Sequence, residues 1–167
     1  GYEDDIVTTE GANQSVSGSV TDKAGNISSI TISNISIDKT KPVITLLSRL
    51  PEANSYGWNN SDATVKYSVS DALSEIDVAA CGYEDDIVTT EGANQSVSGS
   101  VTDKAGNVAS MSISNISIDK TKPAITLLSR LPAANIYGWN NSNVTVKYTV
   151  SDLLSGVDEI AGGYEDD

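Results

Sequence analysis

The segment ATVKYSVS at residues 63–70 determines how we interpret the fold. Its apolar side chains alternate with polar ones, the apolar set being Ala63, Val65, Tyr67 and Val69. Alternation with a period of two, rich in β-branched residues, is typical of a strand with one buried face. The segment VTVKYTVS at 144–151 has the same pattern. The sequence therefore predicts two equivalent strands.

The distance between these two segments is the period of a long internal repeat. Residues 1–26 recur unchanged at 82–107, and of the 86 positions that can be compared one period of 81 apart, 16 differ. A third copy begins with GYEDD at Gly163. A repeat with a fixed period indicates that the chain is built from successive copies of one structural unit. The pattern predicts a segment of a longer tandem array.

Other segments of the repeat also predict strands. PVITLLS (42–48), DIVTTEG (86–92) and the alternation around Val97 and Val101 are typical of strands, and the turn DKAGN leads into a further long strand. In that last strand the alternating phase slips at Asn115, which indicates a bulge or bend. No stretch has a convincing helical period. Short strands separated by Gly, Asn and Asp turns predict an all-β fold of tandem β-sandwiches.

The polar stretch IDKTKP marks the natural boundary between repeats. Placing boundaries there gives one complete domain at 42–120. Residues 1–38 are then the C-terminal half of the preceding repeat, and residues 123–167 are the N-terminal half of the next one.

Composition excludes several classes of function. The chain has no His and one Cys, so it has no Ser-His-Asp triad, no Cys-His dyad and no His-ligated zinc or haem site. A net charge of −13 opposes nucleic-acid binding, which needs cationic side chains. No apolar run approaches the ~18 residues of a membrane span. We therefore expect no enzyme, no nucleic-acid partner and no membrane span in this segment.

Four motifs in order resemble the Ig-like repeats of large prokaryotic cell-surface proteins and adhesins. They are GWNNSDATV (57–65), SDALSEID (70–77), TDKAGN (102–107) and IDKTKP (118–123). The resemblance covers essentially the whole chain. It implies tandem Ig-like sandwiches in a secreted or cell-surface array that acts as a stalk, an adhesin or a coat.

This sequence departs from the family pattern at two positions. The D-x-x-S-G motif is kept at Asp152–Gly156, but Glu75 replaces the glycine in the other copy. Some relatives place a Cys pair near Val69 and Cys81, whereas here only Cys81 is present, with Gly162 one period later. Cys81 is interpreted as a tolerated single thiol, with an intermolecular crosslink as the alternative.

Acidic residues are expected to converge at one end of each complete domain. If the first strand of 42–120 runs away from the linker Ile37–Pro42, the strand 63–70 returns to it, and the loop 71–77 and the DKAGN turn both lie at the linker end. The residues gathered there are Asp38, Asp71, Glu75, Asp77, Asp103 and Asn107. The next junction gathers Asp119, Asp152 and Asp158.

Several oxygen ligands from different loops are what Ca²⁺ requires, and some similar Ig-like adhesin repeats bind calcium at such junctions. The sequence therefore predicts Ca²⁺ sites at the domain junctions. The alternative is that the aspartates cap turns through Asx hydrogen bonds and are otherwise solvated. No EF-hand or nonapeptide calcium motif supports the metal independently.

Two further features have alternative interpretations. Trp58 and Trp139, in the repeated YGWNN, either close one end of a core or stack on a sugar. The acidic run Glu84-Asp85-Asp86 is an exposed loop or strand end, or else a metal or lattice contact.

These features favour a structural segment of a long extracellular, cell-surface protein (a fibre, stalk or coat). Its partners are neighbouring copies of itself in tandem or lateral assembly. The alternatives are a self-assembling sheath or filament subunit, in which terminal half-domains exchange strands, and an adhesin module that binds glycans or cell surfaces.

Overall fold

A computed structural model describes residues 4–80, 82 and 84–158. The described residues form ten strands and no helix, so the predicted all-β class is confirmed. Cys81 and Gly162 lie outside the described residues. Among the described residues there is no helix long and apolar enough to cross a membrane.

The strands follow the repeat. The first copy contributes β1 (Gly11–Thr21) and β2 (Ile27–Ile37), and the complete copy contributes β3 (Val43–Leu50), β4 (Trp58–Asn59), β5 (Ala63–Ser70), β6 (Asp86–Val88), β7 (Gly92–Thr102) and β8 (Val108–Ile118). The last copy contributes β9 (Ala124–Leu131) and β10 (Thr145–Ser151). The strand predicted at 63–70 is therefore confirmed, whereas the one predicted at 86–92 is shorter.

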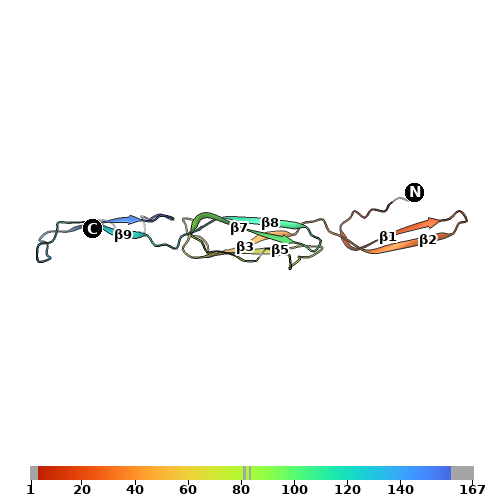
Figure 1. Cartoon of the computed structure of the whole chain (residues 1–167), viewed down its shortest axis with the longest axis horizontal. Coiled ribbons are helices and arrows are strands. Elements are labelled where there is room, and N and C mark those ends of the chain that lie inside the picture. Colours follow the sequence, from red (N-terminus) through yellow and green to blue (C-terminus); the bar gives the residue numbers. More distant parts are fainter. Residues whose placement is uncertain (1–3, 81, 83, 159–167) are drawn as a thin grey trace. The chain divides into compact units, whose positions relative to one another are not determined.

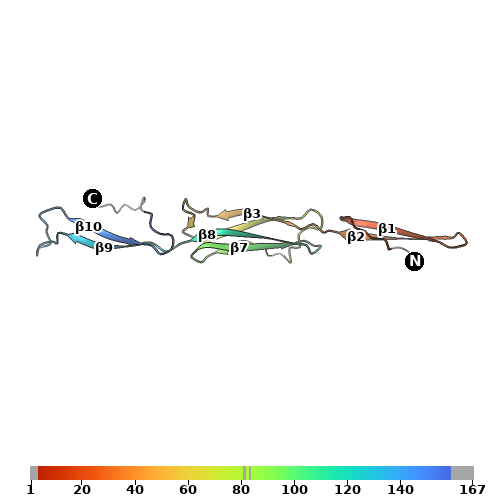
Figure 2. The same cartoon turned by 90° about the horizontal axis from the view of Figure 1, so that it is seen from above.

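Residues 42–120 hold two three-stranded sheets, ordered β3-β5-β6 and β4-β8-β7. In β5 three of the four predicted inward residues are buried: Ala63 and Val65 are fully covered and Tyr67 is 7% exposed, whereas Val69 is half-buried. Tyr67 and Ile44 reach the opposite sheet, where they lie against the backbone of Gly99 in β7. Val88, Val101, Ile116 and Ile118 complete the set of buried hydrophobic residues. This arrangement is consistent with a β-sandwich, and both views show β7 and β8 alongside β3 (Figures 1 and 2).

The phase slip predicted at Asn115 has a backbone cause. Asn115 has φ of +60°, and its equivalent Asn34 in β2 has φ of +64°. Asparagine tolerates this left-handed conformation better than other non-glycine residues. The antiparallel pairing of β1 with β2 shifts register twice near the same end, between Gly11 and Val16. The irregularity moves the inward face from one set of residues to the next, as the sequence indicated.

The chain separates into two compact units, each of which contains one IDKT boundary. The first comprises the described residues up to Arg49, with Thr64–Asp86 and Val97–Ile113, and contains the hairpin of β1 and β2. The second comprises Leu50–Ala63, Ile87–Ser96 and the described residues from Ser114 onward. It contains the antiparallel pair β9 and β10 and the short parallel pairing of β4 with β8.

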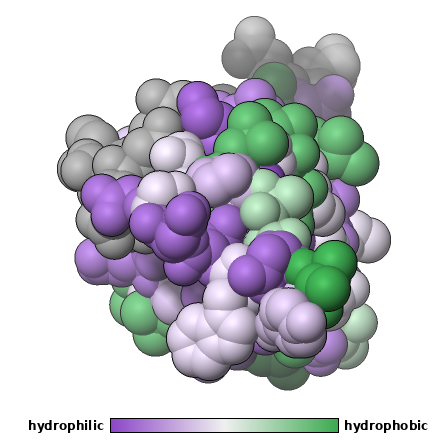
Figure 3. All heavy atoms as spheres, turned by 90° about the vertical axis from the view of Figure 1, so that its left-hand side faces the viewer, coloured by the Kyte–Doolittle hydropathy of each residue, from purple (hydrophilic) through white to green (hydrophobic). Residues whose placement is uncertain are grey.

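Hydrophobic side chains also lie on the surface. Ile136, Tyr137 and Trp139, between β9 and β10, are each at least three-quarters exposed. Figure 3 shows one face on which exposed hydrophobic side chains lie among hydrophilic ones.

Candidate metal centre

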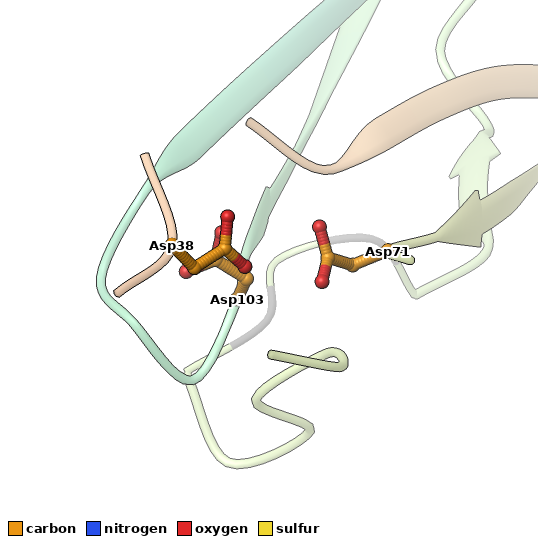
Figure 4. Close-up of side chains that lie close together, drawn as sticks. All are labelled: Asp38, Asp71 and Asp103. Carbon is orange, nitrogen blue, oxygen red and sulfur yellow. The ribbon is translucent and has the colours of Figure 1, made fainter. Parts of the chain in front are cut away.

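Three of the predicted aspartates meet at the first boundary. Asp38 follows β2, Asp71 follows β5, and Asp103 follows β7. One carboxylate oxygen of each lies within 4.8 Å of the others. The carboxylates of Asp38 and Asp103 lie together, and that of Asp71 points toward them (Figure 4). The structure thus brings these three side chains together, as expected from the directions of the strands.

Backbone hydrogen bonds hold each carboxylate in place. The Ser74 N–H donates to both Asp38 Oδ2 (3.0 Å) and Asp71 Oδ1 (2.9 Å), which ties the linker to the loop after β5. Asp71 Oδ1 also accepts from the N–H groups of Leu73 and Glu75. Asp38 Oδ1 accepts from the Thr40 N–H. The contacts of Asp71 with its own loop and of Asp38 with Thr40 are the Asx turns of the alternative interpretation. The contact between Ser74 and Asp38 spans 36 residues and is not an Asx turn.

Asp103 is the buried member of the cluster, with 1% of its surface exposed. Its two oxygens accept from the N–H and the Nδ2 of Asn107, both at 2.8 Å. Asn107 Nδ2 also donates to the backbone carbonyl of Asp38 at 3.2 Å. Asn107 therefore joins the cluster as predicted, but its amide nitrogen serves as a donor that links Asp103 to the linker.

Two residues expected in this cluster have other partners. Asp77 caps its own turn by accepting from the Ala79 N–H, and its N–H donates to Thr102 O. Glu75 forms an exposed ion pair with Lys104. Neither belongs to the three-carboxylate group.

The second boundary repeats part of this arrangement. Asp119 Oδ2 accepts from the Ser155 N–H at 2.9 Å, the same contact one period after Asp38 and Ser74. Asp152 Oδ1 accepts from Leu154 and Gly156. Among the described residues no three carboxylates cluster at this boundary. Asp158 instead forms a hydrogen bond with the Tyr56 hydroxyl, which raises the pKa of Tyr56.

The linker is also tied to the repeat that precedes it. Glu10 accepts hydrogen bonds from the backbone of Lys39 and the hydroxyl of Thr40. One period later Glu91 accepts from Lys120 and Thr121 in the same way. We name these contacts the glutamate clasp. The sequence alone does not indicate the glutamate clasp, because Glu10 and its partners are 29–30 residues apart and the segment resembles a solvated loop.

A cavity of about 400 Å³ lies beside the second boundary. Tyr56, Trp58, Asp119 and Asp158 all line it. Trp58 is half-buried there, whereas its equivalent Trp139 is 75% exposed. The acidic run divides between two contacts: Asp85 pairs with Lys66 at 2.6 Å, and Asp86 accepts from the Tyr67 hydroxyl at 2.7 Å.

The ionised aspartates make stability depend on pH. Burial raises the pKa of Asp103, but hydrogen bonds from Asn107, Ala105 and Gly106 outweigh it and hold the pKa below its usual 3.8. The pKa of Asp119 is also lowered, chiefly by Ser155. A depressed folded-state pKa contributes stability above the unfolded pKa that is lost as pH falls through the folded one.

We therefore expect the free energy of unfolding to fall as pH drops below 3.8, with urea unfolding at pH 7, 5, 4 and 3 as the measurement. The Asp103→Asn variant, which has no charge to lose at that position, is expected to show a shallower decline. An unchanged slope in that variant contradicts the assignment.

No protein-family model matches the chain, and no curated protein or solved structure matches it. Function is therefore inferred from the repeat and from the geometry of its boundaries.

Proposed function

We propose that this chain is a structural segment of a long extracellular surface protein, built of tandem Ig-like β-sandwiches with an 81-residue repeat. Residues 42–120 are one complete domain, and residues 1–38 and 123–167 are halves of its neighbours. The mechanism is mechanical: short linkers hold successive domains in a fixed relation. No catalytic activity is part of the proposal.

The observation that carries this proposal is the repeated attachment of the linker on both sides. At each boundary the glutamate clasp binds the linker to the preceding repeat, through Glu10 or Glu91. At each boundary the linker aspartate, Asp38 or Asp119, also accepts a backbone N–H from the following repeat. A linker bound at both ends loses the freedom of a flexible chain.

We further propose that Ca²⁺ binds at the first boundary through Asp38, Asp71 and Asp103. Calcium binds oxygen ligands at about 2.3–2.6 Å, so two of its ligands lie up to ~5 Å apart. The 4.8 Å limit on the separations of the three oxygens fits this requirement. Mutual repulsion of the carboxylates also favours a cation there. Asp119 and Asp152 supply the corresponding groups at the second boundary.

The second candidate function is glycan binding by an adhesin module, and the cavity beside Trp58 favours it. Aromatic rings that stack on a sugar, next to carboxylates that accept from its hydroxyls, suit a carbohydrate. The cavity combines Tyr56 and Trp58 with Asp119 and Asp158. Binding of the chain to a glycan array, lost in Trp58→Ala, distinguishes this function from a purely structural one.

Immunogold labelling of intact, unpermeabilised source cells tests the proposed location. Antibodies raised against the repeat are expected to label the outside of the cell. Label that appears only after permeabilisation contradicts an extracellular role.

A further inference from the structure

We propose that the edge strand β3 is a lateral contact surface, at which two copies of this chain lie side by side with their β3 strands antiparallel. The proposed function concerns successive domains of one chain, whereas this contact joins two separate chains. The partner is therefore a second copy of this chain.

The strand β3 lies at one edge of the sheet β3-β5-β6 and exposes hydrophobic side chains. Four of its eight residues are large hydrophobic residues that are between 41% and 64% exposed, namely Val43, Leu46, Leu47 and Leu50. The polar residues Ser48 and Arg49 are only half-buried or less exposed than these. Both sheets of residues 42–120 are present around β3, so this exposure belongs to the folded repeat itself.

The other long edge strand of the same repeat has the opposite character. β7 lies at one edge of the sheet β4-β8-β7, and none of its eleven residues, all of which the structure describes, is an exposed large hydrophobic residue. Its exposed side chains are those of Ala93, Asn94, Ser96, Ser98 and Ser100. Soluble domains usually keep their edge strands polar, because an open backbone edge beside apolar side chains can pair with another strand. β3 therefore has the composition of an edge strand with a partner.

Charge complementarity indicates that the partner is the same strand of a second copy. The exposed Lys41 lies two residues before β3, and the exposed Glu52 lies two residues after it. In an antiparallel pair centred between Leu46 and Leu47, Lys41 of each copy lies beside Glu52 of the other, and opposite charges at such positions are stabilising. The strand itself has no acidic residue, so the net charge of −13 lies outside the contact.

The repeat presents the same strand again. β9 differs from β3 only in having Ala124 in place of Val43. A contact through one strand is small, so we expect the association of two copies of this chain to be weak. Several equal contacts along a tandem array increase the overall affinity without any new kind of contact. Antiparallel strands also imply that neighbouring chains run in opposite directions.

The first test introduces lysine at the centre of both equivalent strands. The double variant Leu47→Lys, Leu128→Lys places a charge on each edge, which is a device that natural edge strands use against pairing. The matched control, Ser15→Lys with Ser96→Lys, makes the same change in net charge at exposed positions of β1 and β7. Circular dichroism checks that both double variants keep the strand signal of the native chain.

The second test exchanges the charges at the ends of β3. Lys41→Glu and Glu52→Lys each place like charges side by side at both ends of the contact, although they change the net charge in opposite directions. The variant that combines both substitutions restores the complementary pairs with their signs exchanged. A weakening by both single substitutions that is reversed in the combined variant depends on the antiparallel register and not on the net charge.

Sedimentation equilibrium of the full chain, with a reductant that keeps Cys81 from crosslinking copies, measures the outcome. We expect the mass of the native chain and of the serine control to rise above 17.4 kDa with concentration. The leucine variant is expected to associate at least about tenfold more weakly, because each contact loses a leucine from both copies. Each single charge variant is expected to associate about fivefold more weakly, and the combined variant as tightly as the native chain.

A native chain that stays monomeric at millimolar concentration overturns the proposal and leaves the edge of β3 to a strand of a different protein. Equal association of the leucine variant and the serine control also overturns it. So does a combined charge variant that associates no more tightly than the two single variants. None of these results bears on the linker contacts on which the proposed function rests.

Discussion

Replacing Tyr67 with alanine is expected to lower the free energy of unfolding of the complete repeat by about 3–5 kcal/mol, the usual cost of removing a buried aromatic side chain. The ring is almost fully buried and rests on Gly99 in the opposite sheet. Its hydroxyl also donates to Asp86, and burial together with that carboxylate raises the pKa of Tyr67 to about 12. Urea unfolding of the native chain and of the variant is the measurement.

The repeat supplies the matched control. Tyr148→Ala removes the same side chain from the same sequence setting, but there the ring is 48% exposed. We expect a loss of less than about 1 kcal/mol, because a surface side chain contributes little. Equal losses for the two variants would show that the two sheets do not pack through Tyr67.

Asp71→Asn is expected to abolish the proposed stabilisation of the first boundary by Ca²⁺. If Ca²⁺ binds there as proposed, a concentration of 100 times its dissociation constant is expected to add about 2.7 kcal/mol to the native chain. That corresponds to a rise in Tm of roughly 5–10 °C for a chain of this size. Asparagine keeps the Oδ1 that accepts from Ser74 and Glu75, so the turn is retained while one negative charge is lost. Thermal unfolding in EDTA and then in millimolar Ca²⁺ measures both effects.

The stability of Asp71→Asn in EDTA, compared with that of the native chain, distinguishes a metal site from a turn cap. Without the metal, Asp71→Asn is expected to be as stable as the native chain or more stable, because the carboxylates of Asp38 and Asp103 no longer face a third charge. Asp77→Asn, which lies outside the cluster, is the control and should keep the full calcium response. A native Tm that is the same in EDTA and in Ca²⁺ would leave the aspartates as turn caps alone.

Much of the fold could be predicted from the sequence because period-two patterns are local. The alternation in β5 identified its buried face, and the slip at Asn115 identified the change of backbone conformation there. The alternating directions of the strands then placed Asp38, Asp71 and Asp103 at the linker end of the domain. That inference needs only the order of the strands and turns. Repetition made each inference stronger, since every pattern occurs twice.

Side-chain partners were harder to predict because they depend on loop conformation. The Asp77 carboxylate accepts from the N–H of Ala79 in its own turn, and the Asp77 N–H donates to Thr102 O. Asp158 forms a hydrogen bond with the hydroxyl of Tyr56, which belongs to the preceding repeat. The glutamate clasp gave no local signal, since only the folded boundary brings Glu91 to Lys120. Repetition of an acidic loop residue at a constant distance from IDKT was the one available clue.

Small-angle scattering in solution tests the proposal that the boundaries hold neighbouring repeats in a fixed relation. The measurement compares the native chain with the same chain carrying Glu10→Ala and Glu91→Ala. We expect a single well-defined distribution of interatomic distances for the native chain, and a broader one with a shorter mean for the variant that lacks both glutamate clasps. A native distribution already as broad as that of the variant would show that the boundaries do not fix neighbouring repeats.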